Sequence, residues 1–258
     1  VQVCDATKAS CLFCCRVHNC ISLQYRLSLQ ENSMAVNTGF YKSLIKELNE
    51  KNVTLVAVSK TKPNEDIQAL YEMGQRDFGE NYVQELTDKQ AVLPTDIRWH
   101  FIGHLQSNKV KYIAPFVHLI HGVDSLKLLQ EINKQGIKNE RVIECLLQVY
   151  IAQEETKFGL SFEECEEVLN SPVFKELKNI RVLGFMAMAS NTESETQIRK
   201  EFGSLKHFSD KLQSNSTSNF KPGILSFGMS GDYKLAVECG STMVRIGSTI
   251  FGSRNYNP

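Results

Sequence analysis

A lysine stands two residues after a mostly apolar run that predicts a β-strand. The run covers residues 53–58, and Ser59-Lys60-Thr61-Lys62-Pro63 follows it at once. An amine whose stem packs among apolar neighbours loses solvation, so its pKa falls and the neutral amine becomes a nucleophile for an aldehyde. Lys60 is therefore a candidate for Schiff-base chemistry. The alternative is that Lys60 points to solvent beside Lys62.

Two turns rich in glycine and serine end the last two predicted strands. They are Phe227-Gly228-Met229-Ser230-Gly231-Asp232 and Val244-Arg245-Ile246-Gly247-Ser248-Thr249. Small residues let backbone N–H groups approach an anion, and the loop after the eighth strand is a recurrent phosphate site in α/β barrels. Ser230 is placed to donate to the same phosphate. Opposite Lys60, these turns suit a phosphorylated aldehyde, whereas the plainer interpretation is that they only reverse the chain.

Polar side chains also follow the second and third predicted strands. Glu80-Asn81-Tyr82 follows the second, and the third carries His100 and leads to His104. Such side chains can line a pocket, and histidine can serve as an acid or a base near neutral pH. Because side chains alternate along a strand, we expect His100 to be a structural, hydrogen-bonded histidine. Both roles stay open for His104.

The scaffold that must position these residues is predicted by an alternation of strands and helices from Val53 onward. The predicted strands are residues 53–58, 77–79, 98–102, 117–122, 141–149, 181–188, 223–227 and 243–246. The predicted helices are residues 64–73, 82–92, 108–113, a segment from Ser125, 162–169, 193–212 and 233–239. A loop is expected at 214–219.

Helix boundaries support this alternation. Gly74 closes the first of these helices, and Ser161 with Glu164 forms a capping-box pattern before another. Eight strand–helix units predict a single (β/α)8 barrel, with an open doubly wound sheet as the alternative. In such a barrel the chemistry lies at the carboxyl ends of the strands.

Composition narrows the class of protein. The chain has 258 residues, which suits one barrel of about 250 residues. Its 29 basic and 29 acidic residues give no basic footprint for nucleic acid. No apolar run approaches the ~20 residues that cross a bilayer, so no membrane partner is expected. Five of the eight cysteines crowd the first twenty residues, a pattern that favours a reducing, cytoplasmic compartment over a disulfide scaffold.

The first 35 residues read differently from the rest. Cys11 and Cys14 could bind a metal, but no second pair follows at zinc-finger spacing. Arg16 and Arg26 among few acids would also fit a mitochondrial targeting segment. We expect residues 1–35 to be a poorly ordered extension, in part upstream of a natural start at Met34, and residues 36–258 to form the barrel.

Five sequence blocks run in order through the predicted barrel. They are Val56–Pro63, Phe78–Glu85, Trp99–Lys109, Phe227–Ser230 and Val244–Gly247. Together they closely resemble the YggS/PROSC family of pyridoxal 5′-phosphate (PLP) homeostasis proteins, over about Val53 to Gly252. The segment Lys157-Phe158-Gly159 also resembles the family, with no role assigned.

The resemblance implies a barrel of the alanine racemase N-terminal domain type, in which Lys60 carries PLP as a Schiff base. It also implies that Ser230, Gly247 and Ser248 hold the phosphate, while Asn81 and Arg245 border the pyridine ring. Ser248 stands where many relatives have threonine, and serine keeps the hydroxyl group.

The expected function is a non-catalytic, monomeric PLP carrier in intracellular vitamin B6 homeostasis, with apo forms of PLP-dependent enzymes as the expected partners that receive PLP. An arginine beside the pyridine nitrogen can only donate, so the ring stays unprotonated and is a poor electron sink. The second domain of alanine racemase, with its catalytic tyrosine, is not expected after Phe251.

Two alternatives stay open. A low-activity amino-acid racemase would need a second acid or base, for which His104 or Tyr82 are the candidates. A phosphosugar enzyme of barrel fold without PLP would use the same phosphate turns.

Overall fold

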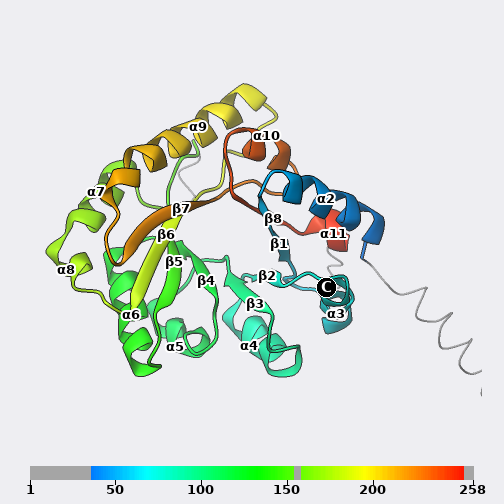
Figure 1. Ribbon diagram of the computed structural model, residues 1–258, viewed down its shortest axis with the longest axis horizontal. Coiled ribbons are helices and arrows are strands. Elements are labelled where there is room, and N and C mark those ends of the chain that lie inside the picture. Colours follow the sequence, from blue (N-terminus) through cyan, green and yellow to red (C-terminus); the bar gives the residue numbers. More distant parts are fainter. Residues whose placement is uncertain (1–35, 154–157, 253–258) are drawn as a thin grey trace, which may run out of the picture. The chain divides into compact units, whose positions relative to one another are not determined.

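Eight parallel strands close into one barrel, in chain order from β1 to β8 (Figure 1). The computed structural model describes residues 36–153 and 158–252. The strands are β1 (Thr54–Val58), β2 (Asp77–Glu80), β3 (Arg98–Phe101), β4 (Leu119–Val123), β5 (Ile143–Gln148), β6 (Ile180–Met186), β7 (Phe220–Ser226) and β8 (Met243–Ile246). The predicted (β/α)8 barrel is confirmed, and the open doubly wound sheet is wrong because β1 pairs with β8.

Helices lie around the outside of the strands (Figure 1). They are α2 (Thr38–Glu50), α3 (Asn64–Glu72), α4 (Val83–Val92), α5 (Val110–Ile113), α6 (Leu126–Lys138), α7 (Phe162–Asn170), α8 (Pro172–Lys175), α9 (Glu195–Lys211), α10 (Tyr233–Glu238) and α11 (Ser248–Phe251). The 3₁₀ turns are η1 (Ser107–Lys109) and η2 (Gln213–Asn215). None of these described helices is long and apolar enough to cross a membrane.

The predicted helix boundaries follow from local chemistry. Gly74, just after α3, has φ +98°, a left-handed conformation that glycine adopts without steric cost. The capping box before α7 is present, because Ser161 accepts from the Glu164 N–H and Glu164 accepts from the Ser161 N–H. Ser125 caps α6 through the Leu128 N–H.

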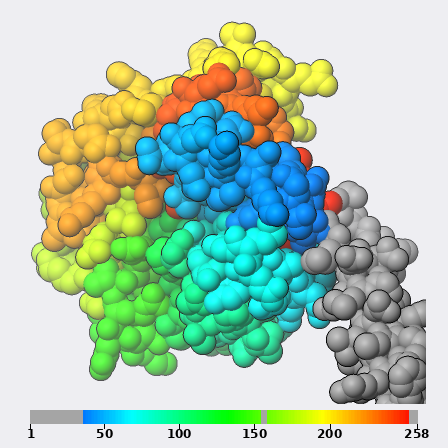
Figure 2. Space-filling model, turned by 45° about the vertical axis from the view of Figure 1, so that its right-hand side comes forward, coloured from blue at the N-terminus to red at the C-terminus, as the bar shows by residue number. Residues whose placement is uncertain are grey.

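The helix α2 was not predicted, although its sequence carries the signal. Asn37 caps it by accepting from the Phe40 N–H, and Tyr41, Leu44 and Leu48 form its buried stripe. Figure 2 shows α2 in blue, between orange atoms above it and cyan atoms below it. The helix packs against β1, which pairs with β8, and against α11.

Four further segments differ from expectation. The short helices α8 and α11 were not predicted, and part of the expected loop at 214–219 forms η2. Strand β7 begins at Phe220 rather than at Gly223. Residues 1–35, with the Cys11 and Cys14 pair, and Lys157 lie outside the described residues, so the division at residue 35 stays a prediction.

The barrel interior has an apolar part and a polar part. Its apolar cluster comprises Val56, Leu119, Leu146, Met186 and Met243. A larger apolar layer lies between the strands and the helices. The polar part, formed by buried side chains of β2, β3, β4, β7 and β8, consists of Asp77, His100, His121, Ser226 and Arg245.

Candidate functional site

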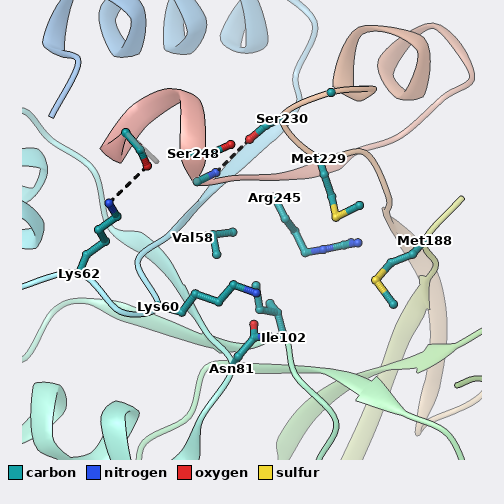
Figure 3. A pocket seen from close by; sticks show the side chains of 13 residues that line it. Val58, Lys60, Lys62, Asn81, Ile102, Met188, Met229, Ser230, Arg245 and Ser248 are labelled. Atoms are coloured by element: carbon teal, nitrogen blue, oxygen red, sulfur yellow. Dashed lines mark hydrogen bonds between the residues drawn. The ribbon is translucent and has the colours of Figure 1, made fainter. Parts of the chain in front are cut away.

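A cavity of about 300 Å³ opens at the carboxyl ends of the strands (Figure 3). Its volume lies at the lower end of the range usual for small-molecule sites. The apolar part of its wall includes Val58, Ile102, Met188 and Met229. All six residues predicted to bind a cofactor line this one cavity: Lys60, Asn81, Ser230, Arg245, Gly247 and Ser248.

Lys60 reaches the cavity because it continues the inward side of β1. Val56 belongs to the inner apolar cluster, and Val58 and Lys60 follow it at the period of two that places side chains on one face. Figure 3 draws the Lys60 side chain extended into the cavity, with its amine near Asn81 and Ile102. The Lys60 side chain therefore lies in the cavity and does not point to bulk solvent, which was the alternative.

A buried ion network holds the start of the turn that carries Lys60. Lys89 Nζ lies 2.7 Å from Glu80 Oε1, 2.7 Å from Glu85 Oε1 and 2.8 Å from the Ser59 carbonyl oxygen. Ser59 Oγ donates to Glu80 Oε1 at 2.6 Å. Burial raises the pKa of the Glu80 carboxyl, and Lys89 opposes that shift. We did not predict this network, although Glu85 and Lys89 are spaced as an i, i+4 pair on a predicted helix.

The remainder of the turn is fixed by two further contacts. The Thr61 N–H donates to Glu85 Oε1 at 2.6 Å, and Thr61 has φ +62°, which is unusual for a β-branched residue. Lys62 Nζ donates to the carbonyl oxygens of Phe251 at 2.8 Å and Gly252 at 3.3 Å. The second lysine therefore ties the turn after β1 to the end of α11.

The two small-residue turns meet on the other side of the cavity. Ser230 Oγ accepts from the Gly247 N–H at 3.4 Å, so the hydroxyl and the amide lie together. A Cβ on Gly247 would lie 2.9 Å from the Val58 carbonyl oxygen, so only glycine lets β8 end this close to β1. Gly228 has φ +95°, and Asp232 Oδ1 accepts from the Met229 N–H at 2.5 Å. Both turns are thus set by backbone geometry.

Arg245 is almost completely buried at the cavity wall. Its Nη1 donates to the Ser226 carbonyl oxygen at 2.6 Å and to Ser226 Oγ at 2.7 Å, and its Nη2 donates to the Ala187 carbonyl oxygen at 3.0 Å. Burial lowers the pKa of the guanidinium to about 10, so Arg245 stays a cation and a donor at neutral pH. Among the described residues that line the cavity, Lys60, Lys62 and Arg245 are basic and none is acidic, which suits an anionic ligand.

Asn81 leaves a polar atom without a partner. Its Oδ1 is buried and makes no hydrogen bond within the part of the chain that the structure describes. Such an atom costs free energy unless a ligand or water satisfies it. The Asn81 backbone is held by close packing, because a Cβ on Gly103 would lie 2.4 Å from the Asn81 carbonyl oxygen.

The histidines and the tyrosine considered as acids or bases do not line the cavity. His104 Nδ1 lies 3.2 Å from Asp124 Oδ2, and its ring stacks on Phe158 with centroids 4.7 Å apart. Tyr82 is 59% exposed. His100 is buried with a hydrogen-bond partner at each ring nitrogen, as expected of a structural histidine.

Comparison with known proteins identifies the family to which the chain belongs. Residues 31–255 match the model of the alanine racemase N-terminal domain. A protein of Aquifex aeolicus named pyridoxal phosphate homeostasis protein is 41% identical over 208 residues, which cover 80% of this chain and 90% of that protein.

Solved structures agree with this match. PipY of Synechococcus elongatus, in a structure without PLP, is 33% identical with a TM-score of 0.78, covering 85% of this chain and all of PipY. A second PipY structure has PLP bound and a TM-score of 0.69, covering 78% of this chain and 93% of PipY. Alanine racemase of Clostridium difficile, 17% identical with a TM-score of 0.65 over 83% of this chain and 58% of the racemase, shares the fold alone.

The sequence identity, the coverage and the barrel agree with one another. The chain therefore belongs to the pyridoxal phosphate homeostasis protein family, within the larger group of proteins that have an alanine racemase N-terminal domain.

Proposed function

We propose that this chain binds PLP covalently through Lys60 and holds it for intracellular vitamin B6 homeostasis. The observation that carries the proposal is the cavity itself, in which a lysine amine stands opposite two small-residue turns. The relatives point the same way, since the Aquifex protein is named for PLP homeostasis and a PipY structure has PLP bound.

The residues of the cavity fit this cofactor. The Ser230 hydroxyl and the Gly247 and Ser248 backbone can receive a phosphate, and the basic lining matches its charge. The partnerless Asn81 Oδ1 lies at the same cavity, where a bound ring or an ordered water can satisfy it. Arg245 also lines the cavity, and the family resemblance implies that its guanidinium would face the ring nitrogen as a donor.

The chemistry of Lys60 is a condensation. Its neutral amine attacks an aldehyde carbon, a C=N bond forms, and one water leaves. PLP supplies that aldehyde and, in enzymes, an electron sink. Arg245 can only donate, so it favours an unprotonated ring nitrogen and weakens that sink. The site is therefore suited to holding the cofactor more than to using it.

The test is an absorbance spectrum of PLP-loaded protein before and after borohydride, followed by mass mapping of the modified peptide. We expect the reduced adduct on Lys60 and its loss in Lys60→Ala. Lys62→Ala is the matched control. Lys62 also lines the cavity, but its amine donates a hydrogen bond to the carbonyl oxygen of Phe251 at the end of α11. An adduct that persists at the wild-type level in Lys60→Ala, or a protein that takes up no PLP, overturns the proposal.

The same sample separates the proposal from the two alternatives. Rapid racemisation of single-enantiomer amino acids, abolished by Lys60→Ala, would replace the carrier with a racemase. Neither His104 nor Tyr82 lines the cavity among the described residues, which disfavours that outcome. A colourless protein that acts on a phosphosugar would support an enzyme without PLP.

Transfer to apo-enzymes, a monomeric state and a cytoplasmic location belong to the same proposal. Mixing PLP-loaded protein with an apo-enzyme tests transfer, since a carrier restores its activity faster than the release of free PLP allows. Light scattering tests the monomer.

A further inference from the structure

A row of buried polar side chains crosses the barrel interior from β2 to the cavity wall. Asp77 Oδ1 lies 3.0 Å from His100 Nε2, and His100 Nδ1 lies 2.9 Å from His121 Nε2. His121 Nδ1 lies 3.0 Å from Ser226 Oγ, which accepts from Arg245 Nη1 at 2.7 Å. We call Asp77, His100, His121 and Ser226 the interior chain. His100, His121 and Ser226 are almost completely buried, so these three side chains depend on one another for hydrogen-bond partners.

Two neutral imidazole rings between a donor-only end and an acceptor-only end fix the direction of the hydrogen bonds in the interior chain. Arg245 can only donate and the Asp77 carboxylate can only accept, so Ser226 Oγ accepts from Arg245 and its own hydrogen points toward His121 Nδ1. His121 Nδ1 is then an acceptor, and a neutral His121 carries its hydrogen on Nε2, from which it donates to His100 Nδ1.

The same reasoning assigns the other histidine. His100 accepts at Nδ1 and carries its hydrogen on Nε2, which donates to the Asp77 carboxylate. Burial opposes ionisation of Asp77, but the hydrogen bonds from Arg98 and His100 outweigh it, so the pKa of Asp77 lies well below its ordinary value. The Asp77 carboxylate, which can only accept, is thus one end of the interior chain. With both histidines neutral, each bond has one donor and one acceptor.

We propose that the interior chain is a positioning device for Arg245, which it holds in one orientation at the cavity wall. This role rests on the proposed function, because the orientation matters for the ring of bound PLP. Hydrogen bonds in series in a buried site reinforce one another, so a change at His121 or Ser226 reaches the guanidinium. The side chains act through Arg245 and need not touch the ligand.

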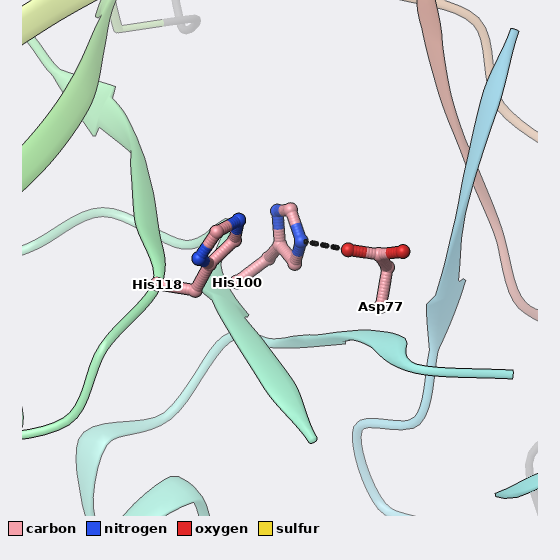
Figure 4. A group of neighbouring side chains, drawn as sticks. All are labelled: Asp77, His100 and His118. Carbon is pink, nitrogen blue, oxygen red and sulfur yellow. Dashed lines mark hydrogen bonds and ion pairs between the residues drawn. The ribbon is translucent and has the colours of Figure 1, made fainter. Parts of the chain in front are cut away.

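A metal site is the competing interpretation of one end of this chain. Ligand atoms of Asp77, His100 and His118 lie within 4.8 Å of one another (Figure 4). Arg98, however, already pairs with both oxygens of Asp77, and both ring nitrogens of His100 have partners. A cation would have to displace the guanidinium and break the chain, so the geometry favours hydrogen bonding.

The first test needs no cofactor. Imidazole ¹⁵N and ¹H spectra of labelled, ligand-free protein, assigned with single histidine variants, report the tautomer of each ring. We expect His100 and His121 to be neutral with the hydrogen on Nε2. A cationic His121, or a hydrogen on its Nδ1, overturns the assigned direction and with it the positioning role. Absence of a PLP adduct at Lys60 would instead count only against the proposed function.

The second test measures the consequence for Arg245. Ser226→Ala removes the hydroxyl that joins His121 to Arg245, and we expect the dissociation constant for PLP to rise about three- to tenfold. We also expect the absorbance band of bound PLP to move and the His121 resonances to shift. A dissociation constant and a band both equal to the wild type would overturn the proposal.

Ser241→Ala is the matched control. Ser241 is also a buried serine beside β7 and β8, but its hydroxyl lies among backbone carbonyl oxygens, nearest that of Phe227 at 2.7 Å, and is not in the interior chain. We expect it to leave the absorbance band unmoved. An equal band shift in both variants would show a general loosening of these strands and would also overturn the positioning role. If Ser226→Ala fails to fold, the tautomers of His100 and His121 in the wild-type protein still test the proposal.

Discussion

Replacing Lys89 with methionine tests how the turn that presents Lys60 is held. The Lys89 and Glu80 side chains are 6% and 0% exposed, so the variant leaves a carboxyl group buried without its cation. Removing one partner of a buried pair costs about 3–5 kcal/mol of unfolding free energy. That is a large part of the ~5–15 kcal/mol that stabilises a typical domain. We therefore expect Lys89→Met to be strongly destabilised at neutral pH.

The loss of unfolding free energy in Lys89→Met should increase with pH. Burial raises the pKa of Glu80 above its value in the unfolded chain, so between these two pKa values the folded protein binds more protons. Stability conferred by protonated Glu80 is therefore lost as the pH rises through that window. Lys89 limits the rise in pKa, and its removal widens the window. The loss in Lys89→Met should be smaller at pH 5 than at pH 7.5.

Urea unfolding of both proteins at the two pH values gives the free energies. Lys211→Met is the control, because Lys211 pairs with Glu166 at 2.7 Å but the side chains are 62% and 36% exposed. That surface pair should contribute no more than about 1 kcal/mol. The double variant Glu80→Gln, Lys89→Met should recover much of the loss, since no charge is left buried. A Lys89→Met loss as small as that of Lys211→Met, or one independent of pH, would refute the reasoning.

Three further outcomes are expected. Ser230→Ala should raise the dissociation constant for PLP roughly tenfold or more, from the ~1.5–3 kcal/mol of a hydrogen bond to a charged group, and an unchanged constant by titration would remove Ser230 from the site. Gly247→Ala should lower unfolding free energy by about 1–3 kcal/mol, because its Cβ would lie 3.1 Å from Val58 Cβ; a thermal midpoint equal to the wild type would contradict this. Burial raises the pKa of the Cys165 thiol to about 12, so peptide mapping after a thiol reagent should find half-buried Cys239 modified well before Cys165, and equal rates would count against the packing.

The sequence predicted the barrel and the composition of the cavity well, for one physical reason. In a parallel barrel all carboxyl ends of strands meet at one mouth, so locating strand ends also locates Lys60 and the Ser230 and Gly247 turns. The roles of these residues toward PLP stay predictions. The helix α2 was not predicted because it precedes the first strand and so lies outside the alternation of strands and helices, although Tyr41, Leu44 and Leu48 have helical spacing.

The interior contacts could not be predicted in the same way. His121 and Ser226 meet across 105 positions of sequence, and nothing local in either segment indicates the other. The Lys89 contact with Glu80 likewise depends on how α4 packs against β2. Such pairs follow from barrel register, which single-sequence patterns do not fix.

The pairing of β1 with β8 has a consequence for synthesis on the ribosome. Val56 and Arg245 are register partners, so the lysine made early meets its opposite wall only when the final strand has emerged. Until then, the Lys60 amine of a growing chain lacks the opposite wall of its cavity, and an aldehyde that reacted with it would make no contact with the Ser230 and Gly247 turns. On the proposed function, PLP would bind only after synthesis, once β8 has closed the barrel.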